Sequence, residues 1–254
     1  MNRFSLLLVG SLLTSSTLTL AQNGGLTQAA LEAASSFVIT NAQVADASRQ
    51  AVQQMDAKNP IAGPNDPYTV RLNKIVSRHR SMNGVPINYK VYMVKDVNAF
   101  ATADGSVRVM KGLMDLMTDQ ELLAVMGHEI GHVINQDSRD GMKAAIRRSA
   151  AINALGSTSG TLGKLSRSQL AGAFDYVANA KFSRQQETEA DDYSYQFLKK
   201  NGYSVMALAS SFEKLAKLSG GGGGKLTEFM SSHPDSAKRA QRIRDRAKRD
   251  GLTR

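Results

Sequence analysis

The stretch MGHEIGHVIN, from Met126 to Asn135, places two histidines four residues apart, with a glutamate directly after the first. On an α-helix this separation is about 400°, so the imidazoles of His128 and His132 project from the same face, one turn apart. Two neutral imidazoles placed in this way can bind one Zn²⁺ at about 2.0–2.1 Å. Glu129 lies to the side, where its carboxylate can accept a proton from a zinc-bound water. This HExxH pattern predicts a zinc site that still lacks a third protein ligand.

The residues around the motif predict that it lies inside a capped helix. Thr118 and Glu121 have the spacing of a capping box and precede an apolar run that begins at Leu122. Gly127 and Gly131 each cost about 1 kcal/mol in a helix relative to alanine, so we interpret them as points where another backbone approaches closely. Ordinary structural histidines on an amphipathic helix are the alternative, which is disfavoured because the chain has only 4 histidines.

The third ligand must come from elsewhere in the chain. His79 and His233 are candidates, although a lone histidine is usually structural. The third histidine of an extended metzincin motif would stand at the position of Ser138, so that motif is incomplete. The chain has no cysteine, and zinc must therefore be held by histidines and carboxylates alone.

An acidic segment, ETEADD, offers a better third ligand. Glu187 and Asp191 are four residues apart and share a helical face, whereas Glu189 points roughly the opposite way. We predict Glu187 as the third ligand, with Asp191 orienting a ligand histidine through a hydrogen bond. A solvated acidic helix face is the alternative for this segment.

Composition and patterning predict a mainly helical chain with a small sheet. Aromatic residues make up only 6% of the 254 residues and there is no tryptophan, which favours helices over a β-sandwich or a barrel. The segments VPINYKVYMVKD and GSVRVMKG, between Asn83 and Gly112, alternate in the manner of strands and predict two or three short ones. The expected class is α+β.

The N-terminus predicts export. Residues 1–21, MNRFSLLLVGSLLTSSTLTLA, have a basic start, an apolar run and small residues before Ala21, as in a secretory signal peptide; a retained membrane anchor is the alternative. Residues 22–40 are expected to form a linker, and residues 41–254 a single peptidase domain. Glycine-rich segments near Gly160 and Gly220 are expected to be mobile loops at the cleft.

The formal net charge of +10 is concentrated in the C-terminal segment AKRAQRIRDRAKRDGLTR. We interpret this segment as a solvated, salt-bridged helix face, with contact to an anionic membrane surface or an acidic partner as the second interpretation. A nucleic-acid partner is disfavoured, because a signal peptide directs the chain away from nucleic acid.

Three ordered motifs, GHEIGH, SRQQETEAD and SHPDSAKRAQRI, resemble those of the HtpX-type zinc metallopeptidases. The chain is similar to the exported LoiP-like branch of this family and more distantly to the BepA-like proteins, over the range from Asp46 to Arg249. LoiP-like proteins often carry a lipidated cysteine after the signal peptide, whereas this chain has Ala21 and Gln22 there. The resemblance implies a zincin-type fold in which the HExxH helix packs against a small sheet.

The resemblance also implies roles for individual residues. It implies zinc ligands at His128, His132 and Glu187, a general base at Glu129, and a supporting carboxylate at Asp191. His233 matches a histidine near the metal, which either stabilises the oxyanion or occupies the open zinc position as a gate. Arg239 matches the arginine six residues after that histidine. The segment from Asn98 to Met110 is implied to edge the cleft and to pair with an extended substrate backbone.

The sequence therefore predicts a periplasmic endopeptidase with one zinc per chain, in which Glu129 activates a zinc-bound water. The expected substrates are unfolded or misassembled cell-envelope proteins, and peripheral contact with the outer membrane or its assembly machinery is a further expectation. Two alternatives stay open at this point. One is a zinc-containing, chaperone-like holdase with little turnover, and the other is a helical scaffold without metal.

Overall fold

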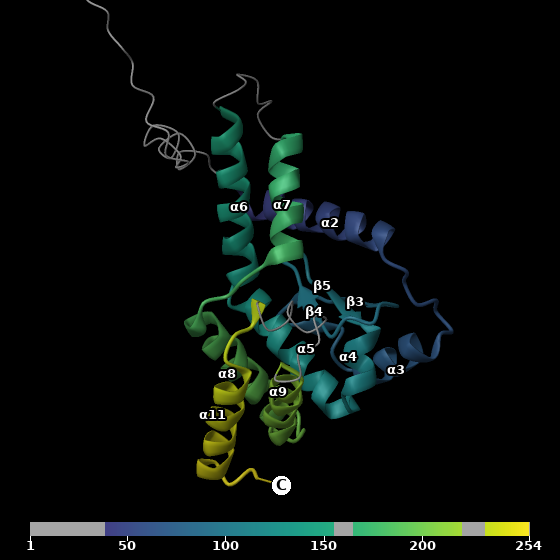
Figure 1. Ribbon diagram of the computed structural model, residues 1–254, viewed down its shortest axis with the longest axis vertical. Coiled ribbons are helices and arrows are strands. Elements are labelled where there is room, and N and C mark those ends of the chain that lie inside the picture. The colour runs from purple at the N-terminus through teal and green to yellow at the C-terminus, as the bar shows by residue number, and fades with distance from the viewer. Residues whose placement is uncertain (1–38, 155–164, 220–231, 254) are drawn as a thin grey trace, which may run out of the picture.

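A computed structural model of the chain describes residues 39–154, 165–219 and 232–253. The predicted signal peptide, most of the predicted linker and the two glycine-rich segments near Gly160 and Gly220 lie outside these ranges. The elements, in chain order, are α2 (Asn41–Lys58), α3 (Pro67–Ile75), β1 (Ser81–Met82), β2 (Val85–Pro86), β3 (Asn88–Tyr92), β4 (Ala99–Ala101), β5 (Ser106–Met110), α4 (Lys111–Leu116), α5 (Asp119–Ile134), α6 (Asp137–Ala154), α7 (Arg167–Asn179), α8 (Arg184–Lys200), α9 (Met206–Ser219) and α11 (Ser236–Arg249). The predicted α+β class, mainly helical with small sheets, is confirmed (Figure 1).

The main sheet has three strands in the order β3-β5-β4. The central strand β5 pairs parallel with β3 and antiparallel with β4, and all five of its residues are buried. Gly105 begins the turn into β5 with φ +82°, and a Cβ there would lie 2.2 Å from the Pro86 carbonyl oxygen, so only glycine fits. Among the described residues, no strand pairs with the outer edge of β4.

Helix α5 lies between this sheet and the C-terminal helices. Its residues from Glu121 to His132 are all buried, so the HExxH motif stands inside the protein. Thr118 caps the helix in a capping box with Glu121, as predicted. The helix packs against β4 and β5 on one side and against α8 and α9 on the other (Figure 1).

The two glycines of the motif allow α8 to cross α5 closely. A Cβ on Gly131 would lie 2.9 Å from the Ala190 Cα, and one on Gly127 would lie 2.9 Å from the Ser194 Oγ. Ser194 in turn donates a 2.7 Å hydrogen bond from its Oγ to the Ala124 carbonyl oxygen. Close approach of another backbone is thereby confirmed at Gly131, whereas Gly127 is approached by side chains. The crossing brings the acidic residues of α8 to the histidine face of α5.

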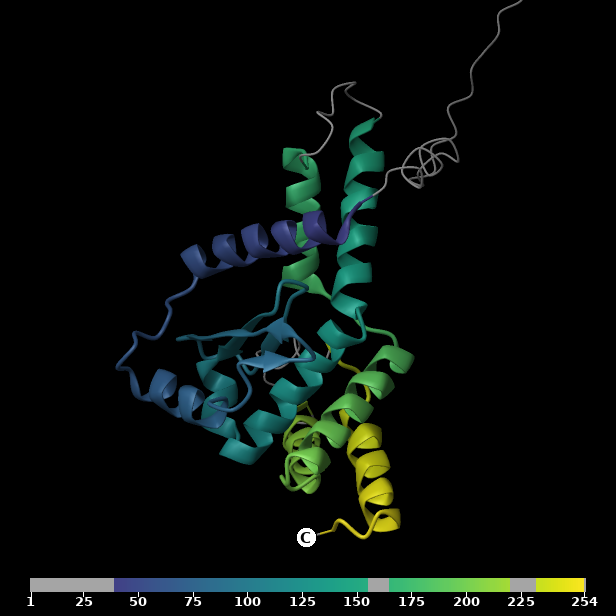
Figure 2. The same cartoon turned by 180° about the vertical axis from the view of Figure 1, so that it is seen from behind.

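A second hydrophobic cluster joins α2 to the hairpin of α6 and α7. Its buried side chains include Val44 and Ala47 of α2, Met142 and Ile146 of α6, and Val177 of α7. Figure 2 shows α2 lying across the two antiparallel helices. In the part of the chain that the structure covers, none of the helices is both long and apolar enough to span a membrane.

The basic C-terminal segment forms α11, which packs beside α8 and α9 (Figure 1). Arg242 and Arg246 pair with Asp192 of α8, and Arg244 pairs with Glu213 of α9. These pairs agree with the salt-bridged helix face expected from the sequence.

Candidate metal centre and active site

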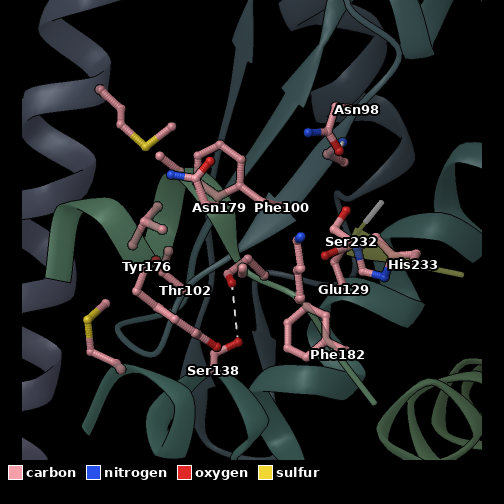
Figure 3. A pocket seen from close by; sticks show the side chains of 18 of the residues that line it. Asn98, Phe100, Thr102, Glu129, Ser138, Tyr176, Asn179, Phe182, Ser232 and His233 are labelled. Carbon is pink, nitrogen blue, oxygen red and sulfur yellow. Dashed lines mark hydrogen bonds and ion pairs between the residues drawn. The ribbon is translucent and has the colours of Figure 1, made fainter. Parts of the chain in front are cut away.

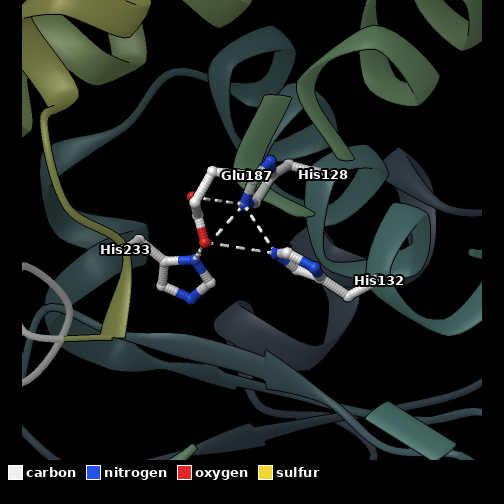
Figure 4. Close-up of side chains that lie close together, drawn as sticks. All are labelled: His128, His132, Glu187 and His233. Atoms are coloured by element: carbon white, nitrogen blue, oxygen red, sulfur yellow. Dashed lines mark hydrogen bonds and ion pairs between the residues drawn. The ribbon is translucent and has the colours of Figure 1, made fainter. Parts of the chain in front are cut away.

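Three separate parts of the chain place their polar side chains at one buried point. Helix α5 contributes His128 and His132, helix α8 contributes Glu187, and the segment before α11 contributes His233 (Figure 4). Their ligand atoms all lie within 4.8 Å of one another, and the exposed fraction of each residue is 3% or less.

The distances between three of these side chains fit a tetrahedral metal ion. His128 Nε2 and His132 Nε2 are 3.2 Å apart. Glu187 Oε2 lies 3.5 Å from His128 Nε2, and Glu187 Oε1 lies 3.5 Å from His132 Nε2. Ligand atoms that surround zinc tetrahedrally at 2.0–2.1 Å are about 3.3 Å apart. His128, His132 and Glu187 therefore lie close enough together to hold such an ion.

His233 lies next to the same three ligand atoms. Its Nδ1 is 3.3 Å from His128 Nε2 and 2.9 Å from Glu187 Oε1. Its Nε2 lies 3.5 Å from Oε1 of Glu129. His233 thus faces both the ligand group and the predicted base, and its two predicted roles, as a gate or as an oxyanion stabiliser, both stay predictions.

Each of the two α5 histidines has a carboxylate at its outer ring nitrogen. His128 Nδ1 lies 2.9 Å from Asp191 Oδ1, and His132 Nδ1 lies 2.9 Å from Asp137 Oδ2. These contacts turn both Nε2 atoms toward the centre of the site. The contact to Asp191 was expected from the sequence, whereas the contact to Asp137 was not.

Arg239 stabilises the acidic side of the site. It donates hydrogen bonds to both oxygens of Asp191, at 2.6 Å from Nη2 and 3.0 Å from Nε, and it also pairs with Glu187. Its guanidinium lies 4.0 Å from the ring centroid of Phe212. The sequence placed Arg239 near the site only through a resemblance, and the structure assigns it this specific contact with two carboxylates.

Phe182 is a second site residue that sequence reasoning missed. Its ring stacks on the His132 imidazole at 3.7 Å between centroids, with 10° between the planes. Its backbone N–H donates to the Ser232 carbonyl oxygen at 3.3 Å, so it also contacts the segment that carries His233. It lies just outside α8, where no helical periodicity could have indicated its direction.

The electrostatics of the two ligand histidines differ. Burial, together with the Arg239 guanidinium, lowers the pKa of His128 to about 3, so this imidazole is neutral, as a metal ligand must be. Burial alone would lower the pKa of His132 as well, but Asp137 and Glu187 raise it to about 9. The carboxylates around His132 therefore attract positive charge, which a divalent cation would also supply.

The carboxylates of the site also differ in their pKa. Burial would raise the pKa of Glu187, but hydrogen bonds from His132 and His233 hold it well below its usual range. Burial would likewise raise the pKa of Asp191, but Arg239 keeps it low. In contrast, burial raises the pKa of Glu129 above its ordinary value. Glu187 is thus a permanent anion, whereas Glu129 can more readily accept and release a proton.

Glu129 has an acceptor atom that the protein does not satisfy. The residue is 2% exposed, and its Oε1 has no hydrogen-bond partner among the described residues. This oxygen lies 3.5 Å from His233 Nε2, which is beyond hydrogen-bonding distance. Buried acceptors without a hydrogen bond are rare and mark positions where a ligand or a reacting group can be bound.

A cavity opens beside Glu129 between β4 and the segment from Val177 to Phe182 (Figure 3). Residues Asn98 to Thr102 line it, so this part of the predicted strand segment does edge a cleft. Pairing of a substrate backbone with that edge stays a prediction.

The remaining candidates lie away from the centre. His79 is buried against Tyr203, with its Nε2 3.1 Å from the hydroxyl oxygen, and has a structural role. Ser138 lines the cavity and donates to the Ala101 carbonyl oxygen at 3.3 Å. Glu189 is exposed and accepts a hydrogen bond from Gln185, as its position opposite Glu187 predicted.

Comparison with known proteins places the chain in a family. Residues 69–247 match peptidase family M48. The chain belongs to this family. It is 47% identical to metalloprotease LoiP of Escherichia coli over 231 residues, which cover 91% of this chain and 90% of that protein. It is 45% identical to metalloprotease YcaL of the same organism over 217 residues, which cover 85% of this chain and 84% of that protein.

A more distant relative of this M48 chain is a putative beta-barrel assembly-enhancing protease of Vibrio cholerae. The identity is 30% over 168 residues, which cover 60% of this chain and 34% of that protein. The resemblance inferred from the three motifs, including that to the LoiP-like branch, is thus confirmed, and so is the prediction that the chain is a metallopeptidase.

Proposed function

We propose that this M48 peptidase is a zinc-dependent endopeptidase that hydrolyses peptide bonds in unfolded or misassembled cell-envelope proteins. The observation that carries the proposal is the convergence of His128, His132 and Glu187 beside Glu129, whose Oε1 has no hydrogen-bond partner among the described residues. His₂Glu ligation with a glutamate after the first histidine is the donor set of zinc peptidases.

His128, His132 and Glu187 would hold one zinc ion per chain. When bound, zinc supplies Lewis acidity, which polarises the scissile carbonyl and makes water a better nucleophile at neutral pH. Asp191 and Asp137 keep the histidines oriented for this ion, and Arg239 holds Asp191 and Glu187 as anions.

Glu129 carries the proton through the reaction. Its Oε1 accepts a proton from the water whose oxygen adds to the carbonyl carbon. As the C–N bond breaks, Glu129 gives this proton to the leaving amine nitrogen. Burial supports both transfers, because it raises the pKa of Glu129 toward the working pH.

The shape of the site suits an extended, unfolded substrate. The outer edge of β4 has no partner strand among the described residues. On this edge the Ala99 N–H donates to Asn98 Oδ1 and the Ala101 carbonyl oxygen accepts from the Ser138 hydroxyl, so a substrate strand would take the place of these two side chains. Main-chain hydrogen bonds of this kind hold a chain without demanding a particular sequence. A folded domain would need local unfolding before it could pair with this strand.

We further propose that the enzyme works in the periplasm and contacts the outer membrane or its assembly machinery peripherally. The signal-peptide pattern of residues 1–21 supports the location. The name of the Vibrio cholerae relative, a putative beta-barrel assembly-enhancing protease, supports the contact.

The test is a comparison of Glu129→Gln with the native protein on unfolded casein. Loss of the general base should lower kcat/KM by about 10²–10⁴-fold while zinc content stays the same. Glu189→Gln, an exposed position on α8, is the matched control and should cleave like the native protein. If native protein and Glu129→Gln behave alike, the peptidase proposal fails, and equal suppression of casein aggregation by both would favour the holdase.

A further inference from the structure

Three segments that are distant in sequence meet at the far ends of α8 and α11. His79, in the segment after α3, has its Nε2 3.1 Å from the hydroxyl oxygen of Tyr203, which follows α8. Lys199, at the end of α8, pairs at 3.0 Å with Asp250, which follows α11. The segment after α3, the end of α8 and the end of α11 are therefore neighbours in the folded protein.

The exposed cations of these three segments form one group, which we call the basic surface. It consists of Lys74, Arg78, Arg80, Lys199, Lys200, Lys248 and Arg249. In the described part of the chain, Lys199 alone among them pairs with an acidic side chain, that of Asp250. Residues 67–95 include no acidic residue at all. The basic surface therefore has a clear excess of positive charge.

Packing and helix electrostatics do not account for all of these cations. The arginines in the middle of α11 each pair with an acidic side chain of α8 or α9, and so stabilise the fold. A cation in the last turn of a helix, such as Lys200 or Arg249, is favoured by the negative end of the helix dipole. Arg78 and Arg80 have neither explanation, because α3 ends at Ile75.

The basic surface fits an anionic membrane better than an acidic protein. Specific protein interfaces usually have a core of apolar or aromatic side chains in which charges are few. Every exposed residue in the ranges 77–84, 199–202 and 248–251 is polar, charged or glycine. A bilayer with anionic headgroups needs only cations near its surface, and each lysine or arginine there strengthens binding about fivefold.

The basic surface lies away from the metal group, at the other end of the same helices. Glu187 stands in the first turn of α8, whereas Lys200 is the last residue of that helix. At about 1.5 Å per residue, these two positions are about 20 Å apart. Helix α11 likewise begins shortly after His233 and ends at Arg249. A membrane that contacts the basic surface would therefore leave the cleft beside Glu129 uncovered.

We propose that the basic surface docks this protein on an anionic phospholipid bilayer, with its cleft directed away from the membrane. The proposal deepens the peripheral membrane contact proposed above and rests on the proposed export. It assigns that contact to a defined surface, which combines the end of α11 with the end of α8 and the segment after α3.

The first experiment measures co-sedimentation with vesicles made of equal parts phosphatidylethanolamine and phosphatidylglycerol, and with vesicles of phosphatidylcholine alone. The native protein should bind the anionic vesicles more strongly and should dissociate from them at raised salt, because salt screens exposed charges. A triple variant, Arg78→Gln with Lys200→Gln and Lys248→Gln, removes one cation from each segment. It should lower the partition coefficient about 100-fold.

The matched control removes the same charge from the other side of the molecule. It combines Lys58→Gln, Arg148→Gln and Arg167→Gln, which are exposed positions on α2, α6 and α7. Figure 1 shows these helices on the side opposite the end of α11. This control should bind anionic vesicles almost as well as the native protein. If the triple variant of the basic surface does not fold, its three single variants repeat the test, each with about a fivefold loss.

Three results would overturn the membrane assignment. One is an equal loss of binding in the two triple variants, and another is equal binding of the native protein to neutral and anionic vesicles. The third is binding of soluble polyglutamate without binding of anionic vesicles, which would indicate an acidic protein partner instead.

Casein cleavage separates this proposal from the proposed function. The triple variant of the basic surface should cleave soluble casein like the native protein, and native protein bound to anionic vesicles should keep cleaving it. If the native protein cleaves nothing but the vesicle results hold, the endopeptidase function fails and the docking surface stands. If vesicles that bind the native protein stop its cleavage of casein, the proposed orientation of the cleft is wrong.

Discussion

Asp137 illustrates how single residues prepare the site. It lies 2.9 Å from the outer nitrogen of His132, and Gln186 of α8 donates to its other oxygen at 3.1 Å. Asp191 lies at the same distance, 2.9 Å, from the outer nitrogen of His128. Helical periodicity was enough to find Asp191, because it shares a face with Glu187. Periodicity could not indicate Asp137, because the chain turns at Gln136, which has a φ of +70°, between the end of α5 and the start of α6. The direction of the Asp137 side chain therefore does not follow from the periodicity of α5.

At the residue scale, we expect Asp137→Asn to weaken zinc binding by about 10–100-fold, since the variant removes the negative charge that supports His132. The dissociation constant can be measured by competition with a chromogenic chelator. Asp140→Asn, three residues further along α6 and exposed, should bind zinc like the native protein. Equal zinc affinity in the native protein and Asp137→Asn would show that Asp137 does not support the ligand.

Among the elements, α2 connects the helical hairpin to the sheet. Its N-terminal half packs on α6 and α7, and near its C-terminal end Asp56 binds three side chains of the sheet. Asp56 accepts three hydrogen bonds from the sheet. They come from Arg108 Nε at 2.8 Å, from Lys90 Nζ at 2.7 Å and from the Tyr92 hydroxyl at 2.7 Å. Met55, beside Asp56, lines the cavity that opens beside Glu129, so this anchor also holds a wall of that cavity.

The Asp56 anchor should make stability depend on pH. Burial would raise the pKa of Asp56, but the hydrogen bonds from Arg108, Lys90 and Tyr92 lower it to about 2. The unfolded state therefore takes up a proton at higher pH than the folded state, and stability falls as pH drops from about 4 toward 2. Asp56→Asn should lower the free energy of unfolding by about 2 kcal/mol at pH 7, and by much less near pH 2.

Denaturant unfolding measures the difference in free energy of unfolding between the native protein and Asp56→Asn at the two pH values. Excess chelator is present throughout, so that metal loss does not contribute. Asp46→Asn, an exposed position on α2, serves as the control and should change stability little at either pH. A constant difference between Asp56→Asn and the native protein at both pH values would contradict the account.

Many elements follow from local sequence alone. The capping box at Thr118 is formed as its spacing predicted, because the paired side chains lie within one helical turn. Capping boxes at Thr40 and Ser183 are equally local in sequence. The parallel pairing of β3 with β5 was not predicted, since alternation indicates a strand but not its partner. The α6–α7 hairpin was also not predicted, because its helices owe their positions to contacts with α2, distant in sequence.

At the scale of the whole molecule, the site exists only because distant segments meet. His128 and His132 come from α5, Glu187 from α8 and His233 from the start of the last segment. The sequence indicated the residue types and the shared faces of two helices. It could not give the crossing of α5 and α8, the stacking of Phe182 or the cavity wall, which depend on tertiary packing of the complete chain.

The central claim is that one zinc ion per chain, held by this group, is required for cleavage of unfolded protein. The most direct test removes metal with a chelator, dialyses the chelator away and follows the rate of casein cleavage while zinc is added. We expect no cleavage without metal, and a rate that rises in proportion to zinc and levels off at one zinc per chain. Full cleavage by the metal-free protein, or a rate that does not respond to zinc, would contradict the account.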